Sequence, residues 1–229
     1  MKYCDFEAAI SQDRLRKYVQ ACSNDTKRAM TLYRYNLKLS QELFVLIGCF
    51  EVSLRNKIDK EMRVHYGNDW LRDFIVPGGL FDSDPRVAGT KNIIKKAYDG
   101  LFSHNNYSHT KLLAEMEFGV WKYMFNNVQY RLTGRILLNI FPNKPFSTSI
   151  NQYDNTFVYN ELDTINVIRN RIAHHEPICF GSPIAVNLQK VRDCYDCMMR
   201  LFLWMNIDSN SLLFGLDHVD SVCRKILNI

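Results

Sequence analysis

Glycine and proline are scarce in this sequence, with 10 and 6 residues among 229. This scarcity argues against a collagen-like fibre, a low-complexity linker and a disordered chain. Hydrophobic residues make up 47% of the chain and charged residues 23%, which is typical of a packed globular protein. Because the length suits one large domain and no linker is evident, we predict a single domain over residues 1–229.

A long apolar run is also missing. The most apolar stretch, Leu43 to Phe50, is far shorter than the roughly 20 residues that cross a bilayer. The charged N-terminal segment contains no apolar run of signal-peptide length. The seven cysteines are odd in number and scattered, unlike the even, dense framework of a secreted disulfide scaffold. We therefore expect reduced thiols and a cytoplasmic protein without membrane association.

The charge balance is mildly basic. Against 29 lysines and arginines stand 24 acidic residues, so the formal net charge is +5. Such an excess permits a polyanionic partner without demonstrating one.

Apolar residues at three- and four-residue steps predict helices over most of the chain. The longest pattern starts after Ser23-Asn24-Asp25, a good N-cap cluster, and runs to about His65. Gly48 is expected to bend this helix or to let another helix approach closely. Further helices are predicted over 6–22, 90–102, 112–125 with an extension towards 140, 157–173, 185–204 and 216–227. Since no period-two pattern and no internal repeat occur, the sequence predicts an all-α bundle.

The sharpest local feature is a cluster of polar residues at a predicted helix end, just before Pro177. It contains Arg169, Asn170, Arg171, His174 and His175. An ideal helix places Arg169 and His174 roughly 140° apart, so these side chains can meet only if the helix ends near His174. Imidazole titrates near neutral pH and guanidinium forks onto phosphate oxygens, a combination that suits phosphodiester chemistry. The alternative is a basic helix end that its histidines cap.

Arg169, Asn170 and His174 match the R-N-x-x-x-H form of the R-x4-6-H motif of the HEPN superfamily. Four further sequence blocks occur in the order that the match requires. They are Tyr33-Arg34-Tyr35-Asn36-Leu37, Glu51-Val52-Ser53-Leu54-Arg55-Asn56, Phe118-Gly119-Val120-Trp121 and Leu203-Trp204. On these blocks, over about residues 30 to 205, the chain resembles the abortive-infection (Abi-like, AbiD/AbiF-type) family.

The resemblance implies a HEPN-type helical bundle with additional helices, often paired as a homodimer. Its expected activity is cleavage of single-stranded RNA without a metal ion or cofactor, in an anti-phage abortive-infection or toxin-type defence system. By carry-over, Arg169 would hold the scissile phosphate, His174 would act as acid or base, and Asn170 would orient one of them. An antitoxin or a small RNA regulator is a possible partner. Glu176 stands where one HEPN toxin subfamily has a modified tyrosine, which disfavours that subfamily.

Within this motif, His174 rather than His175 is expected to transfer the proton. In the family pattern the functional histidine directly follows Ala173, and one further helical step turns a side chain by about 100°. His175 and Arg171 are instead possible supporting or RNA-contacting residues.

Glu51 and Arg55 lie four residues apart and could form an ion pair in the same cleft. A buried structural pair is an equal alternative. Two other functions also stay open. One is a non-catalytic RNA-binding or protein-interaction HEPN module. The other is a metal-dependent nuclease that uses His174, His175 and Glu176. Three adjacent residues converge poorly on one ion, so no metal site is expected.

Overall fold

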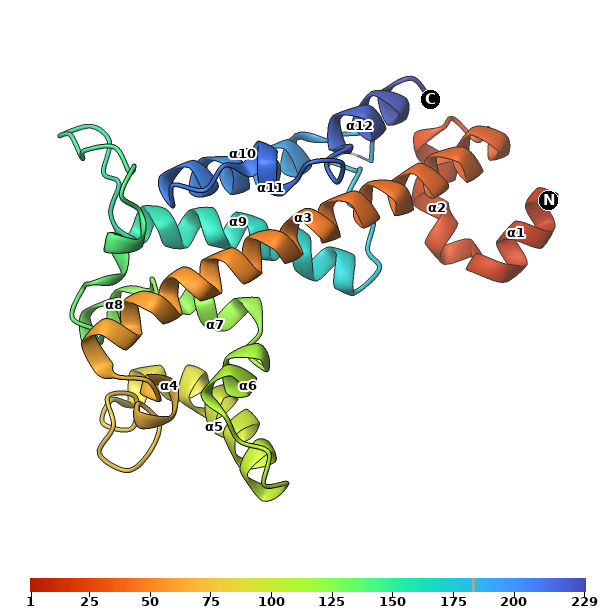
Figure 1. Cartoon of the computed structure of the whole chain (residues 1–229). Helices are drawn as coiled ribbons and strands as arrows, with labels where there is room; N and C mark the ends of the chain where they lie inside the picture. Colours follow the sequence, from red (N-terminus) through yellow and green to blue (C-terminus); the bar gives the residue numbers. More distant parts are fainter. Residues whose placement is uncertain (183) are drawn as a thin grey trace.

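The computed structural model describes residues 1–182 and 184–229 and consists of helices joined by loops (Figure 1). The helices are α1 (Tyr3–Ile10), α2 (Gln12–Ala21), α3 (Thr26–Tyr66), α4 (Trp70–Asp73), α5 (Ala88–Ser103), α6 (His109–Ala114), α7 (Phe118–Tyr123), α8 (Asn127–Leu132), α9 (Asn155–Ala173), α10 (Gln189–Trp204), α11 (Ser209–Leu212) and α12 (Val219–Leu227), with 3-10 turns at Pro85–Val87 and Leu137–Ile140. In these ranges the only β pairing is one isolated bridge, Phe180 with Val186. The predicted all-α fold is confirmed.

The long helix predicted from the apolar pattern is α3, which runs for 41 residues without a break. Asp25 caps its first turn, because the carboxylate accepts the N–H groups of Lys27 (2.9 Å) and Arg28 (3.1 Å). A Cβ added at Gly48 would meet no atom within 4 Å. The expectation that Gly48 admits a close neighbouring helix is therefore wrong.

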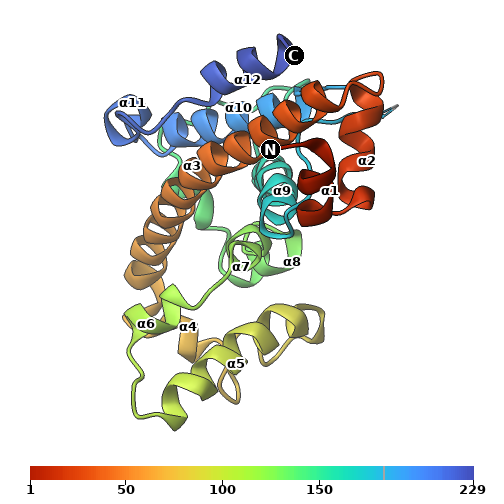
Figure 2. The same ribbon diagram turned by 90° about the vertical axis from the view of Figure 1, so that its right-hand side faces the viewer.

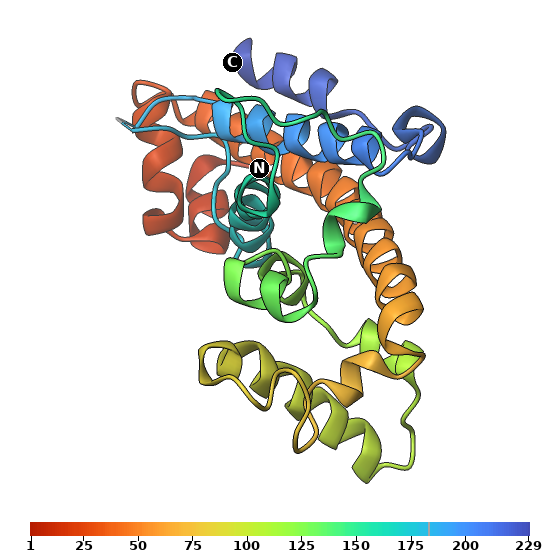
Figure 3. The same cartoon turned by 90° about the vertical axis from the view of Figure 1, so that its left-hand side faces the viewer.

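α3 crosses the molecule, and α1, α2, α7, α9, α10 and α12 pack along it (Figure 1). α12 and α2 lie against it, and α9 and α10 pack beside each other and against α3. Figure 3 shows α9 (teal) nearly end-on, between α10 (blue) on one side and α7 and α8 (green) on the other. The core contact between α3 and α10 includes Phe50 and Phe202, whose rings meet edge to face at 5.3 Å. α9 is thus held on several sides, which fixes the position of its C-terminal end.

The prediction of one helix over residues 6–22 is wrong, because the chain turns at Ser11. This residue has a φ of +81° and separates α1 from α2. Phe6 from α1 and Tyr18 from α2 both pack edge-on against Tyr33 of α3, at centroid distances of 5.5 and 5.2 Å. A sharp corner at Ser11 lets both short helices bury an aromatic ring against the same partner. Figure 2 shows α1 and α2 beside the first half of α3.

The expected extension of the 112–125 helix towards residue 140 is also wrong. The segment is divided into α6, α7, α8 and a 3-10 turn. The buried amide of Asn155 donates to the carbonyl of Phe125 (3.0 Å) and to Oδ1 of Asn127 (2.8 Å). Asn126 meanwhile caps α8 by accepting the N–H of Val128 (3.2 Å). These bonds satisfy backbone groups that a continuous helix would use, so the helix stops.

Two helices start later than predicted, and in each the first helical N–H donates to the Asn or Asp side chain two residues before it. α10 begins at Gln189, whose N–H donates to Oδ1 of Asn187 (2.8 Å). α12 begins at Val219, whose N–H donates to Oδ1 of Asp217 (3.2 Å). The 157–173 and 90–102 predictions lie within α9 and α5 and are confirmed. Among the helices described, none is long and apolar enough to cross a membrane.

Asp59 joins the far end of α3 to α4 and α6. Its Oδ1 accepts Nε1–H of Trp70 (2.9 Å) and lies 2.7 Å from Nε2 of the buried His109, while Oδ2 accepts Nε–H of Arg63 (2.7 Å). Burial alone would raise the pKa of Asp59. The hydrogen bonds from Trp70, His109 and Arg63 outweigh burial and hold that pKa below its usual range. The ionised carboxylate therefore stabilises this corner of the fold.

Candidate functional site

α9 ends in a Schellman turn that contains both histidines of the motif. The N–H of Glu176 donates to the carbonyl of Arg171 (2.7 Å), and the N–H of His175 donates to the carbonyl of Ile172 (3.0 Å). His175 has a φ of +56°, in the left-handed region where helix ends usually carry glycine. His174 directly precedes it as the C-cap, and both imidazoles are exposed. α9 thus ends at Ala173, directly before His174, as the sequence analysis required.

Two residues far away in the sequence hold this turn. Arg14, on α2, donates from Nη1 to the carbonyl of His175 at 2.7 Å. Asn36, on α3, is 2% exposed, and its Oδ1 accepts the N–H groups of Ile178 (2.9 Å) and Cys179 (3.3 Å). The motif is therefore anchored from both sides by the first 36 residues of the chain.

A groove of about 490 Å³ lies between α3 and the last turns of α9. α3 contributes Leu37 and Phe44 to it, and α9 with its terminal turn contributes Arg169, Ile172 and His175. Leu37 is 44% exposed and Phe44 54%, so the groove offers apolar side chains to solvent beside a guanidinium and an imidazole. His174 does not line this groove.

The remaining motif residues point elsewhere. Asn170 is exposed, and its Oδ1 lies 3.4 Å from Nη1 of Arg169. Arg171 lies on the other side of the turn, with Nε 3.4 Å from Oε2 of Glu176. Within the described residues, no hydrogen bond joins Arg169 to His174. Within one chain, Arg169 thus lies close to Asn170 and lines the groove with His175, whereas His174 neither bonds to Arg169 nor lines the groove.

Glu51, on α3, lies within the electrostatic influence of three charged side chains, those of Arg169, Arg55 and Glu117. Burial raises the pKa of Glu51, the positive charges of Arg169 and Arg55 oppose this rise, and the negative charge of Glu117 adds to it. In the part of the chain that the structure describes, no nitrogen–oxygen contact within 4.0 Å joins Glu51 to either arginine. The predicted Glu51–Arg55 ion pair is therefore not formed. Nε of Arg55 is buried without a hydrogen-bond partner.

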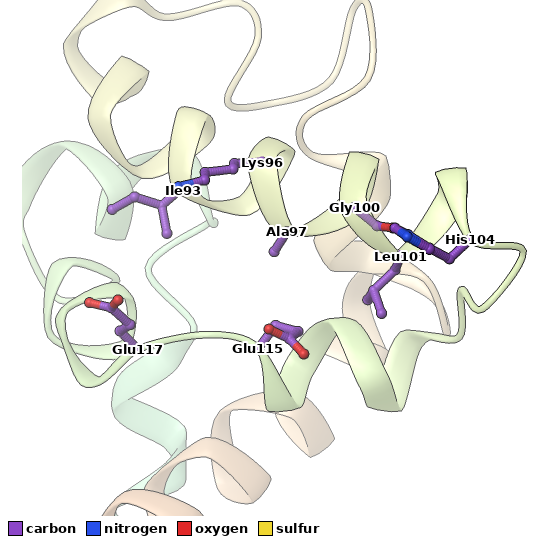
Figure 4. A pocket seen from close by; sticks show the side chains of 8 residues that line it. All are labelled: Ile93, Lys96, Ala97, Gly100, Leu101, His104, Glu115 and Glu117. Atoms are coloured by element: carbon purple, nitrogen blue, oxygen red, sulfur yellow. The ribbon is translucent and has the colours of Figure 1, made fainter.

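Glu117 also opens onto a second groove, of about 500 Å³, between α5 and the segment that joins α6 to α7 (Figure 4). Figure 4 shows Glu115 and Glu117 across the groove from α5, which contributes Lys96, and from His104, the residue that follows α5. This groove contains no residue of the motif at the end of α9. Its mixed charge gives no preference for a polyanion, so we place the candidate site at the α3–α9 groove.

Sequence reasoning did not assign a role to Arg14, Asn36 or Glu117. The sequence does contain an indication for Asn36, because an amide interrupts the buried apolar face of α3 between Tyr33 and Leu39. It contains no such indication for Arg14 and Glu117, because their roles depend on contacts between distant segments. Among residues 1–182 and 184–229, no three His, Cys, Asp or Glu side chains are grouped so as to hold a metal ion.

A family model described as Abi-like protein matches residues 5–179. The chain belongs to the Abi-like family. The match extends over α2, α3 and α9 and therefore over every residue of the α3–α9 groove. Neither the curated proteins nor the solved structures contain a match. Membership of this family associates the chain with abortive infection.

Proposed function

We propose that this Abi-like protein is a metal-independent HEPN endoribonuclease that cleaves single-stranded RNA during abortive infection or a toxin-type defence response. The observation that carries the proposal is the end of α9. There a well-anchored turn presents two exposed imidazoles, and one of them, that of His175, lines an open groove together with Arg169. An imidazole and a guanidinium supply proton transfer and phosphate binding, the two requirements of phosphodiester cleavage.

In this proposal the nucleophile is the 2′-hydroxyl of the RNA itself. It attacks the adjacent phosphorus and expels the 5′-oxygen of the next nucleotide, which leaves a 2′,3′-cyclic phosphate and a 5′-hydroxyl. Arg169 binds the non-bridging oxygens, on which negative charge increases. His174 removes the proton of the 2′-hydroxyl or protonates the leaving oxygen. Asn170, which contacts Arg169, orients the guanidinium or the RNA.

Cleavage of a single-stranded RNA should continue in excess EDTA. The groups assigned to the reaction carry protons and positive charge by themselves, so removal of divalent cations should change the rate less than about threefold. The measurement is gel analysis of a labelled oligoribonucleotide incubated with purified protein, with and without EDTA. Loss of cleavage in EDTA would favour the metal-dependent alternative, and RNA binding without cleavage would favour the non-catalytic alternative.

The protein should form a symmetric dimer in which the Arg169–His174 segments face each other. Among the described residues, no hydrogen bond joins Arg169 to the His174 of its own chain and the two do not line the same groove, whereas a two-fold axis can present the histidine of one protomer to the arginine of its partner. Light scattering at micromolar concentration should report about twice 26.9 kDa. A strict monomer that cleaves RNA would contradict the composite site.

A further inference from the structure

The α3–α9 groove combines an apolar surface with one cationic end. Leu37, Phe44 and Ile172 supply apolar surface, and Arg169 and His175 lie at the end formed by α9. A single nucleotide matches this arrangement, because it has a flat base at one end and a negatively charged phosphate at the other. The groove volume of about 490 Å³ falls within the range usual for small-ligand sites, roughly 300–1,000 Å³.

The groove also contains an amide whose orientation is fixed. Oδ1 of Asn36 accepts two backbone N–H groups, from Ile178 and Cys179, so the side chain cannot exchange its oxygen and nitrogen without losing both bonds. Its Nδ2 group donates to no acceptor among the described residues, although the side chain is 2% exposed and lines the groove. Ser40 and Gln41 supply further polar groups on the next turn of α3. A nearly buried donor of fixed direction is what the edge of a base requires, whereas an aliphatic partner would leave it unsatisfied.

Charge around the groove favours an anionic partner. Arg169 lines it, and Arg14 is bound to the carbonyl of His175 at the same end. Glu176 is the acidic residue of the groove, and its carboxylate lies 3.4 Å from the Arg171 guanidinium, which offsets its charge. An exposed phenyl ring beside a guanidinium suits an unpaired nucleotide, because the base stacks on the ring and the phosphate binds the arginine.

We propose that the α3–α9 groove binds one unpaired nucleobase of the RNA next to the phosphate held by Arg169, with Phe44 stacking on the base and Asn36 donating to its edge. This inference rests on the proposed function, since it takes Arg169 as the phosphate ligand. It assigns Phe44, Asn36 and Gln41 to substrate binding rather than to proton transfer. It also explains why His175 faces the groove while His174, the proposed proton carrier, lies outside it.

The test measures binding in a His174→Ala background, so that it does not depend on cleavage. The probes are a fluorescein-labelled oligouridylate of twelve nucleotides and the same ribose-phosphate backbone without bases, followed by fluorescence anisotropy. The base-bearing RNA should bind at least about tenfold more tightly than the abasic backbone. Phe44→Ala should weaken binding of the base-bearing RNA about tenfold and leave the abasic backbone unchanged.

Val64→Ala is the matched control, because Val64 is a 75% exposed apolar residue near the C-terminal end of the same helix and does not line the groove. It should leave both affinities unchanged. Equal effects of Phe44→Ala on the two probes, or no effect, would overturn the proposal, as would no measurable binding of the base-bearing RNA. A fall in molecular mass on Phe44→Ala would show instead that the groove contacts a second copy of the chain.

Failure of this inference is distinguishable from failure of the proposed function. A base-dependent loss in Phe44→Ala together with an absence of cleavage by the wild-type protein would support the groove and reject the nuclease. Cleavage by the wild-type protein together with identical losses for both probes would support the nuclease and reject the base site.

Discussion

Replacing His174 with Ala should lower the rate of RNA cleavage at least about 100-fold, the usual contribution of a general acid or base. His174 is the exposed C-cap of α9, and its backbone bond to Asn170 does not involve the imidazole. The substitution should therefore leave the fold intact. The measurement is the single-turnover cleavage rate of a labelled single-stranded RNA, with the circular dichroism spectrum as the check on folding.

His175→Ala is the matched control for this prediction. His175 is the next residue, equally an imidazole and equally exposed, but it lines the groove and holds the left-handed position of the turn. Its replacement should reduce the single-turnover rate by less than about tenfold, through weaker RNA binding alone. Equal losses in the two folded variants would contradict the assignment of the proton carrier to His174.

Replacing Asp59 with Ala should lower the free energy of unfolding by about 3 kcal/mol, because it leaves the donors of Trp70, His109 and Arg63 without their shared acceptor. For a chain of this length the midpoint of thermal unfolding should fall by roughly 10 °C. Differential scanning calorimetry measures both quantities. Asp99→Ala is the control, because Asp99 pairs with Lys95 at the surface with both side chains 53% exposed, and exposed pairs contribute little.

The same carboxylate predicts a pH dependence. Since hydrogen bonds depress the folded-state pKa of Asp59, its stabilisation is fully present above the unfolded-state value of about 3.9 and is lost as the pH falls through the lower folded-state value. The stability difference between the wild-type protein and Asp59→Asn should therefore be constant above about pH 5 and decrease below about pH 4. A difference that stayed constant down to pH 2 would contradict this linkage.

The elements that the sequence predicts correctly are those with a continuous apolar face. α3 and α9 each bury a row of side chains at three- and four-residue spacing, and packing and periodicity agree over their whole lengths. The breaks within the predicted helices depend on tertiary contacts. Asn155 reaches the carbonyl of Phe125 from a different helix, and the turn at Ser11 exists because two rings share Tyr33. The spacing of apolar residues along the sequence does not indicate such contacts.

The candidate site, too, can be predicted from the sequence only in part. Arg169, Asn170, His174 and His175 are recognisable from one short stretch of sequence, and the helix end that they need is confirmed. The groove is not recognisable, because it requires Phe44 and Leu37 from α3 to face the last turn of α9. Arg14 reaches the motif across 161 positions of the chain, a contact that no local pattern announces.

The most direct test of the central claim is cleavage of one RNA in excess EDTA beside the same RNA with a single 2′-deoxy nucleotide on the 5′ side of the cut. The proposed mechanism predicts cleavage of the all-ribose strand, with a 2′,3′-cyclic phosphate and a 5′-hydroxyl at the new ends. It also predicts complete protection at the substituted position, since the nucleophile is missing there. Cleavage of the 2′-deoxy position at an undiminished rate would contradict the account.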